Sequence, residues 1–218
     1  MRDCCHSIEA HFESNRASNQ LQELEQSGPA PETRALLSAL TRAGVQGMSV
    51  LDIGAGLGVI AEQLLLAGAR HATLVDISRV YLDAAAQRLA AQGLADRAEL
   101  RAGDLTELTD TVVPADVVTL DKVICCYPDM RALVRQSINK TRRFYGATYP
   151  RSRWIVHLAF WFENLLRILR GNPFRTYVHS PHAIESLLQA AGFELRSVNQ
   201  TFSWRIVLFE RRRDHRQS

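Results

Sequence analysis

Short apolar runs alternate along most of the chain with longer stretches whose apolar positions recur at helical spacing. The short runs predict strands at 48–53, 72–76, 98–102, 115–120 and 144–149. The longer stretches predict helices at 57–67, 80–92, 130–143, 154–170 and 181–191, and the runs 193–198 and 205–210 resemble a closing strand pair. Strands that alternate with helices indicate βαβ units and a parallel sheet, covered on both faces by helices.

The segment before this alternation has a different pattern. Residues 6–27 are polar with sparse apolar positions, which predicts a loosely amphipathic helix or arm. Residues 28–31, Gly-Pro-Ala-Pro, interrupt it, and a second helix is expected at 32–43. No linker or internal repeat divides the chain, so we predict one doubly wound α/β domain, 1–218, with an N-terminal helical cap at 1–45.

Composition supports a folded domain: 46% of the 218 residues are hydrophobic and 22% are charged, which excludes global disorder. The chain has no run of 18 apolar residues, so a membrane-spanning helix is not expected. The polar start of the chain predicts no secretory signal. The four cysteines form two adjacent pairs, Cys4-Cys5 and Cys125-Cys126, which we interpret as reduced thiols. A cytoplasmic location is therefore expected.

Charge is unevenly distributed. Residues 1–130 hold 10 Lys and Arg against 18 Asp and Glu, whereas residues 131–218 hold 16 against 5. Almost all of the positive charge is arginine, because Lys122 and Lys140 are the only lysines. The basic half indicates an anionic partner, such as a carboxylate or phosphate substrate, a membrane surface or nucleic acid, or simply a solvated surface.

The stretch 50–58, Val-Leu-Asp-Ile-Gly-Ala-Gly-Leu-Gly, predicts a strand that enters a glycine-rich turn and opens a helix. Its third glycine is Gly58, whereas a dinucleotide fingerprint would place that glycine at position 59. Asp52 at the strand tip would repel a pyrophosphate and attract an ammonium group. The turn therefore favours a ligand with a cationic end.

Two further acids follow at the tips of the next predicted strands. Asp76 stands 18 residues after Gly58, a spacing typical of a carboxylate that binds a ribose diol, and Asp104 closes the third strand. A ligand with an amino-acid end, a ribose and a purine matches this order. S-adenosylmethionine has these three parts.

With these residues in order, the chain resembles a class I S-adenosylmethionine-dependent methyltransferase over roughly residues 35–210. The resemblance implies a seven-stranded, mostly parallel Rossmann-like sheet with a reversed last strand, a cofactor-binding half at 46–125 and an acceptor-binding half at 126–218. S-adenosyl-L-homocysteine would be the product. The resemblance also implies the cofactor-binding residues: Asp52, Gly54, Ala55, Gly56 and Gly58 at the methionine end, Asp76 and Ile77 at the ribose and adenine, Asp104 and Leu105 at the adenine amine, and Asp121 near the sulfonium.

The acceptor half resembles, in part, the branch that contains magnesium-protoporphyrin IX O-methyltransferase, on the strength of residues 121–128 and 171–179. That branch methylates a propionate carboxylate of a macrocycle. Where the branch has a histidine just before Tyr-Pro, this chain has Cys126. The comparison therefore favours an anionic, apolar acceptor without identifying a porphyrin.

The predicted helix 153–170 carries a wide apolar side and a polar side that is rich in arginine. The apolar side could line a pocket for a flat ring, lie on a membrane surface, enter the core or form a dimer seam. Tyr149, Arg153, Trp161 and Arg175 are the candidate acceptor contacts, with the arginines on the anionic end. A carboxylate acceptor needs no general base, whereas a phenol or amine would need one, and Tyr127, His157 and His179 are the candidates.

The favoured function is therefore methyl transfer to a carboxylate or phenol of a small apolar or aromatic molecule, without a metal, since no ligand-spaced cluster is present. A nucleic-acid methyltransferase is the first alternative, through the basic half and Arg211 to Arg213. Against it, Asp121-Lys122 stands where an Asn-Pro-Pro-Tyr/Phe motif would be expected. A non-catalytic cofactor-binding partner is the second alternative. The sequence leaves open the oligomeric state, including a dimer, and peripheral membrane association through 153–170.

Overall fold

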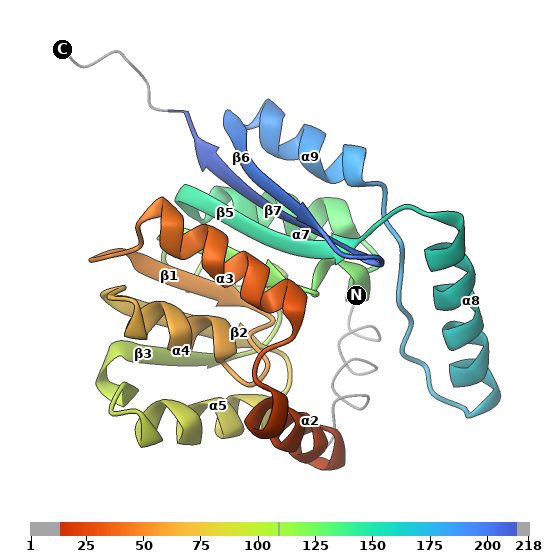
Figure 1. The fold of residues 1–218 in the computed structure, drawn as a ribbon, viewed down its shortest axis with the longest axis horizontal. Helices are drawn as coiled ribbons and strands as arrows, with labels where there is room; N and C mark the ends of the chain where they lie inside the picture. The colour runs from red at the N-terminus through yellow and green to blue at the C-terminus, as the bar shows by residue number, and fades with distance from the viewer. Residues whose placement is uncertain (1–13, 109, 213–218) are drawn as a thin grey trace.

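Seven strands form one sheet in the order β3-β2-β1-β4-β5-β7-β6. The computed structural model describes residues 14–108 and 110–212. The first five strands are mutually parallel and β7 is antiparallel to both of its neighbours, which confirms the predicted Rossmann-like methyltransferase fold (Figure 1). The strands are β1 (Ser49–Ile53), β2 (His71–Asp76), β3 (Ala98–Ala102), β4 (Ala115–Asp121), β5 (Thr141–Pro150), β6 (Phe193–Gln200) and β7 (Trp204–Arg211).

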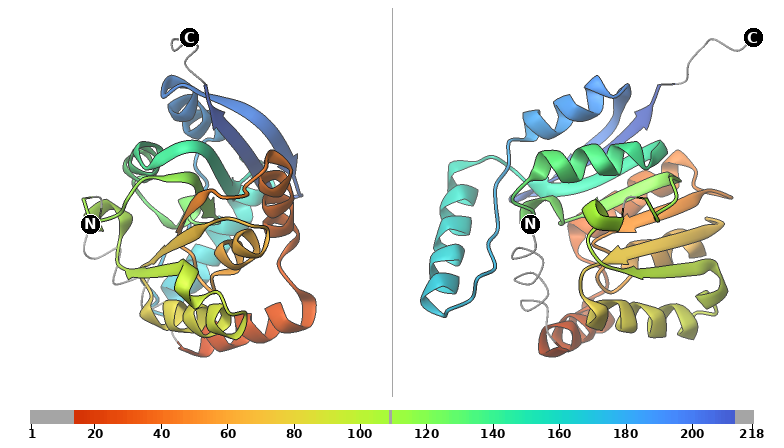
Figure 2. Two further views of the ribbon diagram at one scale, coloured as in Figure 1. Left: turned by 90° about the vertical axis from the view of Figure 1, so that its left-hand side faces the viewer. Right: turned by 180° about the vertical axis from the view of Figure 1, so that it is seen from behind.

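Helices cover both faces of the sheet, as the two views of Figure 2 show. Helices α3 (Pro31–Ala43), α4 (Val59–Leu66) and α5 (Arg79–Ala91) pack on one face, and α6 (Leu105–Leu108), α7 (Met130–Asn139) and α9 (Pro181–Ala190) on the other. Neighbouring strand residues alternate between the two cores: Val50 and Val117 face the first set of helices, and Leu51 and Val118 the second. The unbroken apolar runs in the sequence reflect this two-sided burial.

The N-terminal helices cross the carboxyl edge of the sheet. Helix α2 (Ser14–Ser27) packs its Ala17 against Leu57 and Tyr81, next to the glycine-rich turn. Gly28 lies between α2 and α3 with a φ of 70°, a conformation that glycine adopts without strain. Residues 1–13, including Cys4 and Cys5, lie outside the described residues.

The structure differs from the sequence prediction at the end of one helix and in one predicted loop. Helix α7 ends at Asn139 rather than at 143, because Thr141 already pairs with Ala115 in the sheet. The segment after β3, predicted as a loop, contains the short helix α6. Asp104 stabilises its start, since the Thr106 amide donates to the Asp104 Oδ1 atom at 2.8 Å.

Helix α8 (Trp154–Leu169) stands apart from the sheet (Figure 1), and Val156 is its one buried residue. Residues 170–180 return along it toward α9. Among residues 14–108 and 110–212, no helix combines the length and apolar character needed to cross a membrane.

Candidate cofactor and acceptor site

A cavity of about 820 Å³ opens at the carboxyl ends of β1, β2 and β4. The strand order changes direction between β1 and β4, and open α/β sheets bind their ligands at such a position. The α2–α3 connection and the first turn of α3 form the opposite wall. The volume lies within the range of about 300–1,000 Å³ that small-molecule sites occupy.

The glycine-rich turn forms the floor of this cavity. Gly54 and Gly56 line it with φ angles of 64° and 52°. A Cβ atom on Gly54 would lie 2.3 Å from a methyl carbon of Val123, so a larger residue does not fit there. Gly58 has a different place: it caps α4 and faces Leu74 and Ala85 rather than the cavity.

Asp52 at the end of β1 is buried, with 1% of its surface exposed. Thr119 donates to its Oδ1 atom at 2.7 Å, whereas its Oδ2 atom has no hydrogen-bond partner among the described residues. Burial raises the pKa of this carboxyl to about 7. An unpaired carboxylate oxygen in a cavity fits a cationic ligand group such as the ammonium of an amino acid.

The next two acids lie along the same cavity. Asp76 accepts hydrogen bonds from the amides of Gly56 and Ser78 at 2.8 and 2.9 Å, and burial raises its pKa. The Tyr127 hydroxyl donates to the Oδ2 atom of Asp104. The ends of β2 and β3 are adjacent in the sheet, so these carboxylates line one side of the cavity.

Asp121 at the end of β4 contacts α3. Thr33 donates to its Oδ2 atom at 2.6 Å, and its Oδ1 atom has no hydrogen-bond partner among the described residues. Lys122 has a φ of 62°, which is unusual for a residue with a side chain, and its ammonium pairs with Glu32 at 3.3 Å. The sequence analysis missed Thr33 and Glu32, because nothing local signals a contact across about 90 residues.

The structure brings most of the predicted cofactor residues together in this cavity. Those that line it are Asp52, Gly54, Ala55, Gly56, Asp76, Ile77, Asp104, Leu105 and Asp121, and the candidate base Tyr127 joins them. Tyr81, which the sequence analysis did not single out, also lines the cavity, and its hydroxyl donates to Gln20 of α2 at 2.8 Å.

The candidate bases other than Tyr127 lie outside the cavity lining. His179 contacts the Tyr127 carbonyl oxygen at 2.9 Å, and burial lowers its pKa. His157 is exposed on α8 and hydrogen-bonds to Ser152 at 3.1 Å. Tyr149, which was predicted as an acceptor contact, also lies outside the cavity lining: it is buried within the fold and donates to Glu185 at 2.8 Å.

The predicted acceptor contacts on and beside α8 also point elsewhere. Arg153 lies over the Phe202 ring at 4.7 Å, Arg175 donates to the carbonyls of Asn172 and Phe174, and Trp161 is 61% exposed to solvent. The basic side chains that line the cavity, among the described residues, are instead Arg34 and Lys122.

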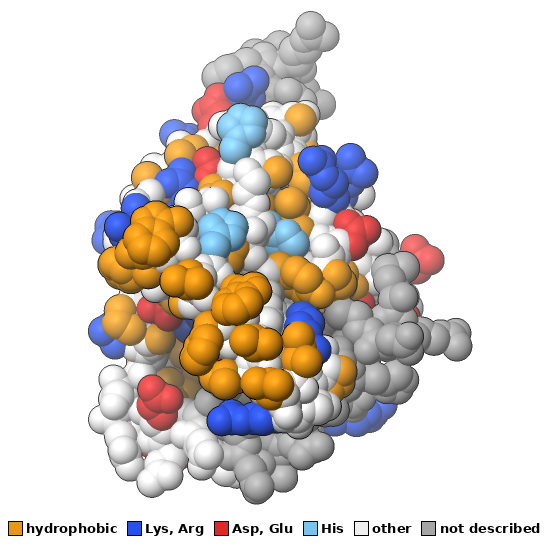
Figure 3. All heavy atoms as spheres, turned by 90° about the vertical axis from the view of Figure 1, so that its right-hand side faces the viewer, with side chains coloured by type: hydrophobic (Ala, Val, Ile, Leu, Met, Phe, Trp, Pro, Cys, Tyr) orange, Lys and Arg blue, Asp and Glu red, His pale blue; other side chains and the backbone are white. Residues whose placement is uncertain are grey.

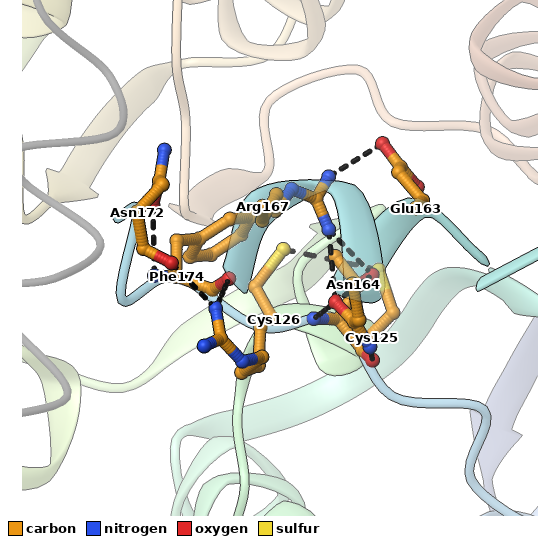
Figure 4. A network of polar contacts seen from close by, with 9 residues as sticks. Cys125, Cys126, Glu163, Asn164, Arg167, Asn172 and Phe174 are labelled. Carbon is orange, nitrogen blue, oxygen red and sulfur yellow. Dashed lines mark hydrogen bonds and ion pairs between the residues drawn. The ribbon is translucent and has the colours of Figure 1, made fainter. Parts of the chain in front are cut away.

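Cys125 and Cys126 lie beside residues of the inner side of α8 (Figure 4). Their sulfur atoms are 3.8 Å apart, and Cys126 lines the cavity. The hydrogen bond from Cys125 and the charge of Arg167 hold the pKa of Cys126 below its usual value, whereas the pKa of Cys125 is raised. In the described part of the chain, no group of three or more His, Cys, Asp or Glu side chains is placed to hold a metal ion.

Comparison with known proteins gives the family. Residues 50–143 match the model of a methyltransferase domain. Residues 50–143 therefore form a methyltransferase domain. This match confirms the predicted methyltransferase assignment for the part of the chain that holds the glycine turn and the acids at the strand tips, and it supports the predicted cofactor.

Several methyltransferases share the domain. A ubiquinone biosynthesis O-methyltransferase of Neisseria meningitidis is 29% identical over 70% of this chain and 66% of its own length. A ribosomal protein L11 methyltransferase of Shouchella clausii is 24% identical over 84% of this chain, and a release factor glutamine methyltransferase of Cereibacter sphaeroides is 34% identical over 47%. The chain spans 50% and 38% of the length of these last two relatives.

Solved structures share the architecture. Magnesium protoporphyrin IX methyltransferase from Synechocystis PCC 6803, with bound S-adenosylhomocysteine, superposes with a TM-score of 0.72 and 18% identity. The alignment covers 94% of this chain and 98% of that one. An O-methyltransferase family protein from Burkholderia thailandensis also has a TM-score of 0.72, over 92% of this chain and 61% of its own. At these identities the likeness establishes the fold.

Proposed function

We propose that the chain methylates a carboxylate or phenol oxygen of a small, largely apolar molecule, with S-adenosylmethionine as the methyl donor. One observation carries this proposal: the acids expected to bind the cofactor share one continuous cavity with an apolar wall that includes Val123 and Leu133. Donor and acceptor would then lie in a single cavity. Such a space favours an in-line displacement by aligning the reactants and excluding water.

The residues of the cofactor side fit the donor. The unpaired Oδ2 atom of Asp52 would accept a hydrogen bond from the ammonium group, and the glycine turn leaves room for the methionine backbone. Asp76 would bind the ribose hydroxyls, and Asp104 the adenine amine. Bound S-adenosylmethionine supplies a methyl group that its sulfonium charge activates.

The acceptor side favours an anion that needs no base. Lys122 and Arg34 line the cavity and would attract a carboxylate, which is already ionised near neutral pH. The Tyr127 hydroxyl already donates to Asp104. A phenol hydroxyl could instead donate to the unpaired Oδ1 atom of Asp121. We therefore rank a carboxylate first and a phenol second.

The comparisons include an O-methyltransferase and leave the acceptor open. One relative is a ubiquinone biosynthesis O-methyltransferase and one structural neighbour a magnesium protoporphyrin IX methyltransferase, while other relatives act on a ribosomal protein and a release factor. Nucleic acid remains the alternative that the basic half suggested. An acceptor panel separates these classes directly.

The test offers the purified protein methyl-labelled S-adenosylmethionine with a porphyrin propionate, a polyprenyl phenol, ribosomal protein L11, a release factor and transfer RNA. We expect label in the organic-soluble small molecules. Faster labelling of either protein or of the RNA would overturn the proposed acceptor class. Cofactor binding without transfer to any acceptor would favour the non-catalytic partner.

A lysine pair provides a matched control for the anion site. Lys122→Gln should raise the acceptor KM several-fold and leave the cofactor KM nearly unchanged, because the lost charge lies on the acceptor side. Lys140→Gln changes the only other lysine, which does not line the cavity, and should leave both constants unchanged. Equal effects of the two substitutions would contradict this placement of the acceptor.

A further inference from the structure

Helix α8 turns its polar side inward and its apolar side outward. Asn164 donates to the Thr176 carbonyl at 2.7 Å and accepts from the Thr176 amide at 3.0 Å. Arg167 donates to the Thr176 hydroxyl at 3.0 Å and lies over the buried Phe174 ring (Figure 4). The inner contacts of the helix are therefore largely polar, the reverse of an ordinary surface helix.

The outer side of α8 is a broad apolar surface. At 100° per residue the exposed large apolar side chains of the helix fall within an arc of roughly 140°. Trp154 is 74% exposed, Leu158 54%, Phe162 55% and Leu169 74%. Seen face-on, hydrophobic side chains gather over the helix, with Lys and Arg at the margins (Figure 3). A continuous exposed surface of this kind marks a docking site.

The surroundings of this surface are positively charged and aromatic. Residues 150–184 contain five arginines and one acidic residue, Glu163, which pairs with Arg167. Arg153 and Arg170 are exposed at the two ends of the helix. Phe202, at the β6–β7 turn, is 59% exposed and extends the apolar surface beneath Arg153.

We propose that the outer face of α8 docks on the surface of an anionic lipid bilayer. A helix that lies in the membrane interface has an apolar face with Trp, Phe and Leu, and basic residues that attract anionic headgroups. Helix α8, at 16 residues and about 24 Å, has both features and suits an in-plane position.

The same charges oppose the main alternative, a dimer through α8. An antiparallel two-fold pairing of two α8 helices would set the Arg153 end of one copy beside the Arg170 end of the other, both positive, and the exposed acid of the helix, Glu163, is already paired with Arg167. A bilayer with anionic lipids neutralises both ends at once. Charge complementarity therefore favours the lipid surface.

Docking would place the acceptor side of the cavity near the bilayer. Helix α8 starts just after the carboxyl end of β5. Its inner residue Arg167 lies close enough to Cys126, which lines the cavity, for its charge to lower the pKa of that thiol. An acceptor dissolved in the membrane would then be close to the site. The docking itself needs no acceptor and no methyl transfer, so its test is independent of the proposed function.

The test is vesicle flotation of the full-length protein with phosphatidylcholine vesicles, alone or mixed with phosphatidylglycerol. We expect the protein to float with the mixed vesicles and the double variant Leu158→Glu, Trp161→Glu to lose at least about tenfold in binding. The matched control is Leu66→Glu with Val113→Glu, two exposed apolar residues on other elements, which should float like the unmodified protein. Equal melting temperatures show that all three proteins are folded.

Two further measurements test separately the charge attraction to the bilayer and the insertion of the apolar face. Arg153→Gln with Arg170→Gln should weaken binding to the mixed vesicles, and added salt should do the same. Fluorescence of Trp161, isolated by Trp154→Phe and Trp204→Phe, should shift to the blue on vesicle binding. The proposal is overturned if the unmodified protein does not float, if the α8 variant floats equally well, or if light scattering shows a dimer that only the α8 variant dissolves.

Discussion

At the scale of single residues, the buried carboxyl of Asp52 determines how the site responds to pH. Its pKa of about 7 means that a large share of the molecules carry a protonated Asp52 below neutrality. A protonated carboxyl does not attract the cofactor ammonium, so affinity should fall as pH falls below 7, by up to about tenfold per unit. Calorimetry across pH 5.5–8.5 measures this, and a flat profile would contradict it.

The same carboxyl affects stability in the opposite direction. Because its folded-state pKa is raised from 3.8 to about 7, ionisation of Asp52 opposes folding. The stability that the protonated carboxyl contributes is therefore lost as pH rises between these two values. Asp52→Asn should therefore raise the melting temperature of the cofactor-free protein at pH 8 but have little effect at pH 4, while weakening cofactor binding. Thermal unfolding at both pH values tests this, and equal shifts would refute the assignment.

Cys126 should react faster with thiol reagents than Cys125. Its pKa is lowered by the Cys125 hydrogen bond, and it lines the cavity, whereas Cys125 is buried with a raised pKa. S-adenosylhomocysteine should slow the labelling by filling the cavity. Mass spectrometry after iodoacetamide treatment identifies the modified residue, and preferential labelling of Cys125 would show that exposure and pKa have been assigned to the wrong thiol.

At the scale of elements, a hydroxyl group of α3 binds the carboxylate at the end of β4. Thr33→Val removes the hydrogen bond to Asp121 and leaves a half-buried carboxylate without a hydrogen-bond partner among the described residues. The free energy of unfolding should fall by about 1–3 kcal/mol. Chemical denaturation measures the change, and Ser38→Ala on the exposed side of the same helix should stay within about 0.5 kcal/mol.

At the scale of the whole molecule, ligand binding should stabilise the fold. S-adenosylhomocysteine should raise the melting temperature in proportion to the logarithm of its concentration once it is in excess. Asp76→Ala should reduce that increase, whereas Asp83→Ala, on the exposed side of α5, should retain it. Differential scanning fluorimetry provides the comparison, and an undiminished shift in Asp76→Ala would remove that residue from the site.

Metal dependence is also a property of the whole molecule. The proposed displacement uses a methyl group that is already activated, and in the proposed site the carboxylates would bind groups of the cofactor. Activity should therefore be unchanged in excess chelator. A loss that magnesium restores would show that Asp104 or Asp121 holds a cation during turnover.

Much of the cofactor half was predictable from the sequence. Strand runs, helix periodicity and the glycine turn are local patterns, and chain order alone places Asp52, Asp76 and Asp104 at one edge, because the carboxyl ends of parallel strands meet there. The domain match over residues 50–143 covers this part. Local information was sufficient because each acid lies at or just beyond the carboxyl end of its own strand.

The acceptor half depended on tertiary contacts. Periodicity showed that α8 has a polar and an apolar side, but which side faces inward is decided by the bonds from Asn164 and Arg167 to the returning segment 170–180. For the same reason Trp161 faces solvent, and Lys122 and Arg34 take the cavity positions that were predicted for Arg153 and Arg175. The sequence determined which surfaces exist, and only folding decided what each surface faces, because those contacts join residues that are distant along the chain.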